Sequence, residues 1–290
     1  MTMLIQKNAQ MIPDHEHQHL ISIEDRGFLY GDGCFSTAHY GRGEIQLWKR
    51  HLERFEKAIP ALCLNCDIDR INIDKENFLN QISAQYGENA HGTIKILISR
   101  GQGQRGYAPP DQDADLYFYF YPKSENSNSS EIPTLEKVGL MDQALSSPMQ
   151  QLRGIKSLNR LEQVILKHQA NQQAWHEALC FDQNDDLVEG ISSNCFVYMN
   201  GQWHTPDLAL AGIDGVMRQE ILSRMQHFQI AHQIRKIKRS ELASVQAIFF
   251  CNSLHSMQIV QTLIDDTAER QLDQNICQTV FQQLQLSDLS

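Results

Sequence analysis

The sequence predicts a mixed α+β protein of two domains, and three observations support this. The chain has 290 residues, of which 41% are apolar, which is ample for two packed cores. Short β-branched and aromatic runs are mixed with amphipathic helices, without a regular βαβ alternation. A polar stretch rich in Ser and Asn is typical of a linker. We therefore expect a smaller α/β domain at 1–121, a linker at 122–131 and a larger mixed β domain with helices at 132–290.

The first domain is expected to combine short strands with two helices. The strands are predicted from β-branched and aromatic runs, joined by a turn at Gly41–Gly43. These runs are 21–23, 33–40, 45–48, 93–99 and 116–121. Leu52, Phe55 and Ile59 recur at spacings of three and four, which predicts a helix over 50–62. A second helix is predicted over 75–86.

The second domain is expected to begin with a helix over 158–173, on which Leu158, Leu161 and Ile165 share one face. A further helix begins at Val216. Asn200–Gly201 predicts a tight hairpin. The expected strands are 177–181, 193–199 and 247–251.

Composition excludes several classes of function. The formal charge of -10, with no basic stripe, argues against nucleic acid as a partner. No apolar run is long enough to span a membrane, and the N-terminus lacks a secretory pattern, so we expect a cytoplasmic protein. Seven cysteines favour reduced thiols over a disulfide framework.

Four short motifs carry little weight. Cys63 and Cys66 form a lone C-x-x-C without a redox context, and the sequon at 128–130 is expected to be inert. His15, His17 and His19 alternate as on a strand, but no acid or cysteine stands at metal-ligand spacing, so no metal is expected. The run 101–106 matches G-x-G-x-x-G, but prolines follow it where a dinucleotide site needs a helix.

Lys156 and Glu189 are the candidates for cofactor chemistry. Lys156 stands in a Gly-Ile-Lys-Ser-Leu-Asn stretch before the predicted helix, and Glu189 begins a Glu-Gly-Ile-Ser-Ser-Asn segment. A lysine amine can hold pyridoxal phosphate as a Schiff base, and an acid can keep its pyridine nitrogen protonated. Either residue alone is more often a surface charge.

Three further segments suit anionic groups. Glycines precede the helix at Val216, whose free backbone N–H groups make a phosphate cradle. Asn252 and Ser253 follow a strand and can add a hydroxyl and an N–H. The loop with Arg100, Arg105 and Tyr107 is suited to a carboxylate, although a solvated loop is the alternative.

These residues together make the chain resemble the fold-type IV pyridoxal phosphate enzymes. This group comprises branched-chain and D-amino acid aminotransferases and 4-amino-4-deoxychorismate lyase. The resemblance spans nearly the whole chain and includes the runs 25–35, 51–55, 99–107, 154–164, 215–218 and 251–253. It implies the two-domain fold of the D-amino acid aminotransferases and pyridoxal 5'-phosphate as cofactor.

The resemblance also implies roles for individual residues. Lys156 becomes the Schiff-base lysine and Glu189 the partner of the pyridine nitrogen. The phosphate ligands become Arg54, the amides of Val216 and Met217, Ser253 and Asn252.

Within the group, the chain is most similar to the lyase branch, mainly in the arginine-bearing loop. Leu161 stands where the aminotransferases often carry a tyrosine. The implied reaction releases pyruvate and 4-aminobenzoate from 4-amino-4-deoxychorismate, in folate synthesis, with Arg100, Arg105 or Arg153 on the substrate carboxylates. A D-amino acid or branched-chain aminotransferase and a non-catalytic cofactor-binding or interaction protein are the alternatives. A homodimer is expected, as is usual in the group.

Overall fold

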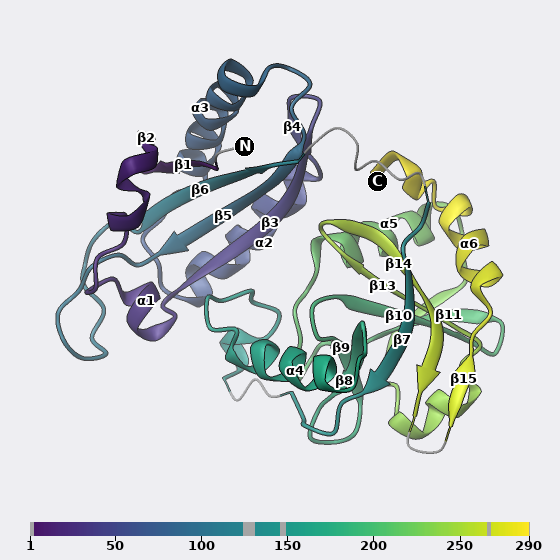
Figure 1. Cartoon of the computed structure of the whole chain (residues 1–290). Coiled ribbons are helices and arrows are strands. Elements are labelled where there is room, and N and C mark those ends of the chain that lie inside the picture. Colours follow the sequence, from purple (N-terminus) through teal and green to yellow (C-terminus); the bar gives the residue numbers. More distant parts are fainter. Residues whose placement is uncertain (1–2, 124–130, 146–148, 266–267, 290) are drawn as a thin grey trace. The chain divides into compact units, whose positions relative to one another are not determined.

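A computed structural model describes residues 3–123, 131–145, 149–265 and 268–289. The chain forms two compact units (Figure 1). The first unit contains residues 1–128 and Ile155–Asn159, and the second contains Ser129–Gly154 and Arg160–Ser290. The sequence assigned all of 132–290 to one domain, whereas the structure packs Ile155–Asn159 with the first unit. Most of the predicted linker, with its sequon, lies outside the described residues.

The first unit is built on a six-stranded antiparallel sheet in the order β2-β1-β6-β5-β3-β4. Strand burial alternates, so one face of the sheet is buried and the other is partly open. Ile94, Ile96 and Ile98 point into the core, while Lys95 and Leu97 occupy the open face. The strands are β1 Leu4–Lys7, β2 Gln10–Ile12, β3 Gly33–Gly41, β4 Glu44–Ile45, β5 Gly92–Ser99 and β6 Asp115–Pro122.

Two long helices cover the buried face. Helix α2 (Trp48–Ala61) contributes Phe55 and Ile59 to the core, and helix α3 (Ile68–Tyr86) contributes Phe78. The Asp67 carboxylate caps α3 by accepting from the Asp69 N–H, which explains its start seven residues before the predicted Lys75.

Three predictions for the N-terminal region were wrong. Residues 21–23 lead into the short helix α1 (Arg26–Tyr30), because the Asp25 carboxylate caps that helix. Trp48 begins a helix instead of ending a strand. The histidines of 15–19 lie in the 3-10 helix η1 (Asp14–His19), so their spacing is not that of a strand.

The second unit is a nine-stranded mixed sheet in the order β12-β11-β10-β13-β14-β7-β8-β9, with β15 paired to β14. Strand β9 also lies beside β10, so the sheet curls around a core that includes Phe181, Val197 and Phe250. The strands are β7 Thr134–Leu140, β8 Glu177–Phe181, β9 Leu187–Gly190, β10 Asn194–Met199, β11 Gln202–Pro206, β12 His232–Arg235, β13 Ala247–Asn252, β14 His255–Ile264 and β15 Glu269–Gln271.

Helices α5 (Val216–His227) and α6 (Gln274–Gln283) pack against β13. Helix α4 is Leu161–Gln172, which starts three residues after the predicted Leu158. Short 3-10 turns complete the second unit: η3 Gln150–Leu152, η4 Arg239–Ser244 and η5 Leu286–Leu289.

The predicted face of α4 was wrong. Leu166 and Ala170 are buried, whereas Leu161 and Ile165 are 64% and 49% exposed.

Candidate functional site

Lys156 lies in an extended segment that runs along the beginning of β3. The Phe35 N–H donates to the Lys156 carbonyl (3.0 Å), and the Leu158 N–H donates to the Gly33 carbonyl (3.0 Å). These bonds fix the lysine backbone to the sheet, and the Lys156 Nζ atom lies 4.6 Å from the centre of the Phe35 ring. The lysine is thus held by its backbone and by an aromatic ring before any ligand binds.

A second ammonium group shares this ring. The Lys95 Nζ atom is 5.0 Å from the centre of the Phe35 ring. Burial lowers the pKa of Lys95 below its usual value. Two lysine amines therefore lie beside the Phe35 ring on the open face of the first sheet, and a protonated amine there suits an anionic ligand.

Arg54 projects from α2 towards β3. Its Nη1 atom donates to the Ser36 hydroxyl (3.1 Å), and that hydroxyl also bonds the Nδ1 atom of His51 (2.7 Å). Burial, reinforced by the charge of Arg54, lowers the pKa of His51 to about 3, so this imidazole is neutral near pH 7. Arg54 and Lys156 thus contact successive residues of β3, Ser36 and Phe35, whose side chains point to opposite faces of the sheet.

Arg100 is a structural residue in this fold. Its three guanidinium nitrogens donate to the Asp32 carboxylate (2.7 Å) and to the carbonyls of Cys63 (2.8 Å) and Leu62 (2.6 Å). Asp32 also accepts from the Arg26 Nε atom (2.9 Å). Burial alone would raise the pKa of Asp32, but the bonds from the two arginines outweigh it and lower that pKa. The sequence suggested that Arg100 contacts the substrate. In the structure its guanidinium instead anchors the end of α2.

Arg105 and Tyr107 lie in an exposed loop, and Tyr107 is 86% exposed. The loop backbone is fixed by Arg26, whose Nη1 and Nη2 atoms donate to the carbonyls of Gly106 (2.9 Å) and Tyr107 (3.1 Å). The Tyr107 ring lies 5.5 Å from that of Tyr30. A fixed backbone with outward side chains is suited to contacting a ligand or a second chain.

In the second unit, Glu189 is buried at the end of β9. Its Oε2 atom accepts from the Ile213 N–H (2.9 Å) and from the Asn194 Nδ2 atom (3.3 Å). Burial lowers the pKa of Arg160, while the charge of Glu189 acts in the opposite direction. The charge of Glu189 therefore partly offsets the cost of burying the Arg160 guanidinium.

Helix α5 begins beside this carboxylate. Gly215 is the N-cap, and no side chain in the described structure caps the helix, so its first N–H groups rely on other acceptors. Val216 and Met217 are buried there. Arg218 anchors the helix by donating to the Pro206 carbonyl (2.9 Å) and the Thr205 hydroxyl (3.3 Å).

Asn252 and Ser253 lie close to the same place. Asn194 pairs with Cys251 across β10 and β13, and the Asn252 Nδ2 atom donates to the Ser193 hydroxyl (3.0 Å). The Asn252 Oδ1 atom accepts from the N–H groups of residues 254 and 255, which forms the turn that holds Ser253. The second unit therefore brings Glu189, the start of α5 and the 252–253 turn together around Asn194.

Arg153 is part-buried in the second unit. Its Nη1 atom donates to the Ala209 carbonyl (3.0 Å). The next residue, Gly154, donates its N–H to the Gly212 carbonyl (3.1 Å). Arg153 is thus fixed to the loop that leads into α5.

Three polar residues of these clusters were not identified as site residues from the sequence. They are Ser36, Asn194 and Glu177, whose carboxylate accepts from the N–H groups of Ile191 (2.8 Å) and Ser192 (3.2 Å). Each forms hydrogen bonds with a residue that is distant in the sequence or lies across a turn. A single sequence does not reveal such a pairing. The one available signal was the position of Asn194 at the end of the segment begun by Glu189.

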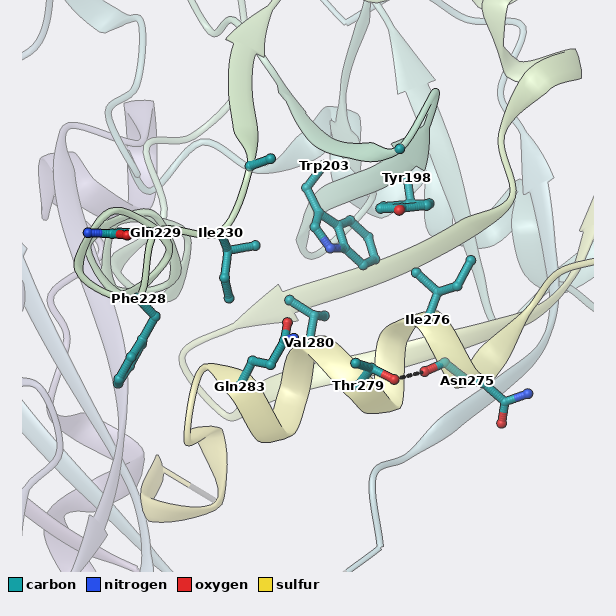
Figure 2. Close-up of a pocket in the computed structure, with 12 residues that line it drawn as sticks. Tyr198, Trp203, Phe228, Gln229, Ile230, Asn275, Ile276, Thr279, Val280 and Gln283 are labelled. Carbon is teal, nitrogen blue, oxygen red and sulfur yellow. Dashed lines mark hydrogen bonds between the residues drawn. The ribbon is translucent and has the colours of Figure 1, made fainter.

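A groove of about 680 Å³ lies elsewhere in the second unit (Figure 2). Tyr198, Trp203 and Phe228 line it, with Asn275 and Thr279 from α6. No charged side chain and no predicted site residue takes part, so the groove does not suit an anionic substrate. Within the described ranges, no helix has the length and apolarity needed to cross a bilayer, and no cluster of three or more His, Cys, Asp or Glu forms a metal site.

Comparison with known proteins identifies relatives over most of the chain. Residues 33–263 match the family "Amino-transferase class IV". An aminodeoxychorismate lyase of Vibrio harveyi is 29% identical over 235 residues, which cover 81% of this chain and 84% of the relative.

Solved structures give a consistent result. The 4-amino-4-deoxychorismate lyase of Pseudomonas aeruginosa is 28% identical, with a TM-score of 0.81 and coverage of 98% of both chains. A hypothetical aminotransferase of Mycobacterium tuberculosis, in a PLP-bound form, has the same TM-score of 0.81, covers 98% of both chains and is 17% identical. The predicted mixed α/β fold of the fold-type IV enzymes is confirmed by these matches.

Proposed function

The chain belongs to the amino-transferase class IV family, and from this membership we propose that it is a pyridoxal phosphate-dependent lyase. The reaction converts 4-amino-4-deoxychorismate to 4-aminobenzoate and pyruvate. The similarity to two lyases, at 29% and 28% identity, carries the proposal. Because 4-aminobenzoate is a precursor of folate, the reaction belongs to folate synthesis, and we propose a cytoplasmic location.

The residues of the second unit fit the phosphate of the cofactor. The N–H groups at the start of α5 have no side-chain cap among the described residues. A Cβ atom at Gly215 would collide with the Asn194 Oδ1 atom, so this position has no room for a side chain. We assign the phosphate to the amides of Val216 and Met217, the 252–253 turn, and Arg54 of the first unit.

Lys156 and Glu189 are assigned to the reactive part of the cofactor. When bound, pyridoxal phosphate supplies an aldehyde for an amine and a ring that accepts electrons. Lys156 holds the cofactor through its Nζ atom, and Glu189 keeps a proton on the pyridine nitrogen. The bonds from Ile213 and Asn194 to Glu189 support this role, because they fix the orientation of the carboxylate.

In the proposed reaction, the free Lys156 amine takes the proton from the amine-bearing ring carbon of the substrate. The C–O bond to the enolpyruvyl group then breaks, and the ring becomes aromatic. The enolpyruvyl group leaves as the enolate of pyruvate, and Lys156 returns the proton to it. No amino acceptor is consumed, since the substrate nitrogen stays in 4-aminobenzoate.

Arg105, Tyr107 and Arg153 are assigned to the substrate carboxylates. The loop with Arg105 and Tyr107 combines a fixed backbone with exposed side chains. Arg153 is tied to the loop before α5 by the Ala209 carbonyl. Arg100 is not assigned to the substrate, because its guanidinium nitrogens donate hydrogen bonds to Asp32 and to the end of α2.

We also propose a homodimer. Helix α4 exposes Leu161, Val164 and Ile165, which are 64%, 62% and 49% exposed. These three side chains lie within about one helical turn of one another. An apolar group of this kind on an exposed helix is suited to burial against a second chain.

The deciding experiment supplies purified holoenzyme with 4-amino-4-deoxychorismate and no keto acid. We expect pyruvate and 4-aminobenzoate in equal amounts. A requirement for a keto acid would instead identify an aminotransferase, the alternative that the family name supports. Release of neither product, with or without a keto acid, would contradict both enzymes.

A second experiment tests Lys156 directly. Borohydride reduction of the holoenzyme, followed by peptide mass spectrometry, should find the reduced cofactor on Lys156. Lys156→Ala should carry none, while Lys167→Ala, on α4, should be labelled like the wild type. Cofactor on any other lysine of the wild type would contradict the assignment.

A further inference from the structure

Glu189 and Asn194 stand at the two ends of a rigid turn. The turn is closed by the Gly190 N–H, which donates to the Ser193 carbonyl (2.7 Å). The buried carboxylate of Glu177 holds the outside of the turn, since it also accepts from the Ser192 hydroxyl (2.7 Å). The positions of Glu189 and Asn194 relative to one another are therefore set by the backbone and by a third buried acid.

The Asn194 side chain reaches two partners at once. Its Nδ2 atom donates to the Glu189 Oε2 atom (3.3 Å) and to the Ile213 carbonyl (2.9 Å). The Ile213 N–H returns a bond to the same Oε2 atom (2.9 Å). Three residues thus form a closed ring of hydrogen bonds, which restricts rotation of the carboxylate.

The other end of the same amide faces the start of α5. A Cβ atom built on Gly215 would overlap the Asn194 Oδ1 atom. The φ angle of Gly215 is -71°, which alanine adopts without strain, so the amide oxygen is the obstacle to a side chain there. Asn194 therefore fills the space between the Glu189 carboxylate and the first turn of α5.

We propose that Asn194 is a positioning residue that couples the two ends of the cofactor site. Through Nδ2 it fixes the carboxylate assigned to the pyridine nitrogen, and through Oδ1 it packs against the helix start assigned to the phosphate. This inference rests on the proposed function only for the identity of the cofactor. The coupling itself belongs to the second unit and exists without a ligand.

The first test uses the apoprotein and amide hydrogen exchange. In Asn194→Ala, the Ile213 N–H loses the neighbour that fixes its acceptor, so we expect its exchange to become at least about tenfold faster. Asn275→Ala, an exposed asparagine on α6, is the matched control and should exchange like the wild type. Unchanged protection of Ile213 in Asn194→Ala would contradict the proposal.

The second test is a double-mutant cycle on cofactor affinity, measured by titration with pyridoxal phosphate. Gly215→Ala alone displaces the Asn194 amide, and we expect affinity to fall about tenfold or more. In the Asn194→Ala background the added methyl group has room, so Gly215→Ala should cost less than about threefold. Equal costs in the two backgrounds would show that the residues act independently, which overturns the coupling.

The third test measures the protonation of the pyridine nitrogen by NMR, with ¹⁵N-labelled cofactor. Asn194→Ala should shift the pyridine nitrogen signal towards the unprotonated form at a given pH, and kcat should fall more than KM rises. A loss of stability alone would leave the signal of the folded fraction unchanged, and that result would overturn the positioning role. Failure of the wild-type enzyme to release pyruvate would refute the lyase reaction, while the exchange and affinity results would still decide the role of Asn194.

Discussion

The Lys156 Nζ atom lies 4.6 Å from the centre of the Phe35 ring, at the beginning of β3. The backbones of the two residues are also joined, because the Phe35 N–H donates to the Lys156 carbonyl (3.0 Å). Phe35 therefore makes two contacts with Lys156, a hydrogen bond between the backbones and a contact between the ring and the amine. Replacement of the side chain removes only the second contact, which makes it testable.

Near neutral pH, Phe35→Leu should speed covalent attachment of the cofactor to Lys156, because the cation–π contact stabilises the ammonium form and only the neutral amine attacks the aldehyde. A cation–π contact is worth about 0.5–2 kcal/mol, so we expect an effect of roughly 2- to 30-fold. Phe35→Tyr keeps the ring and should stay within about twofold of the wild type. The rate is measured by borohydride trapping after addition of pyridoxal phosphate to the apoprotein. Equal rates in the leucine and tyrosine variants would show that the ring does not stabilise the ammonium form of Lys156.

Arg100 and Arg105 should respond in opposite ways to the same substitution. Arg100→Gln breaks a buried contact with Asp32, so the free energy of unfolding should fall by about 3–5 kcal/mol. Arg105→Gln is on an exposed loop and should change that free energy by less than about 0.5 kcal/mol, yet raise KM about tenfold or more. Urea unfolding and steady-state kinetics of both variants check this contrast. A destabilised Arg105→Gln with normal KM would reverse the assignment.

The contrast also shows where prediction from the sequence succeeds. The strands 93–99 and 177–181 were predicted closely because short apolar runs mark buried strands, and the helix 50–62 because the spacing of Leu52, Phe55 and Ile59 marks one face. Arg100 and Arg105 share one glycine-rich loop and looked equivalent. Only the fold reveals that Arg100 turns inward to Asp32 and to the end of α2, since those partners are distant in the sequence.

The same limit applies to whole elements. Strands β1 and β2 were not predicted, because four and three residues carry too little periodicity. Helix α4 was given the wrong face, because Leu161 and Ile165 have the spacing of a buried stripe but are exposed. An apolar stripe shows that a helix has a partner, and it does not identify that partner.

His51 should make the protein less stable in mild acid. The pKa of His51 is about 3 in the folded protein, whereas the pKa of an unfolded histidine is near 6.5. Below pH 6.5, the unfolded chain therefore binds a proton at this residue that the folded chain does not bind. The neutral His51 contributes fully to the free energy of unfolding above pH 6.5, and this contribution decreases by about 1.4 kcal/mol for each pH unit below that value.

Between pH 7 and 5, His51→Gln should therefore lose about 2 kcal/mol less than the wild type. Urea unfolding at the two pH values measures the difference. His15→Gln changes an exposed histidine and should behave as the wild type does. An unchanged pH dependence in His51→Gln would show that the buried imidazole does not carry the effect.

The exposed apolar face of α4 predicts how the dimer is broken. Leu161→Glu with Ile165→Glu places two charges on this face, and burial of an unpaired charge costs several kcal/mol. We expect a dimeric wild type and a monomeric double variant, measured by light scattering during gel filtration at several concentrations. Ile73→Glu is the control, because Ile73 is 62% exposed on α3 and stands outside the α4 face. A double variant that stays dimeric would assign the interface to another surface, whereas a monomeric wild type would contradict the homodimer itself.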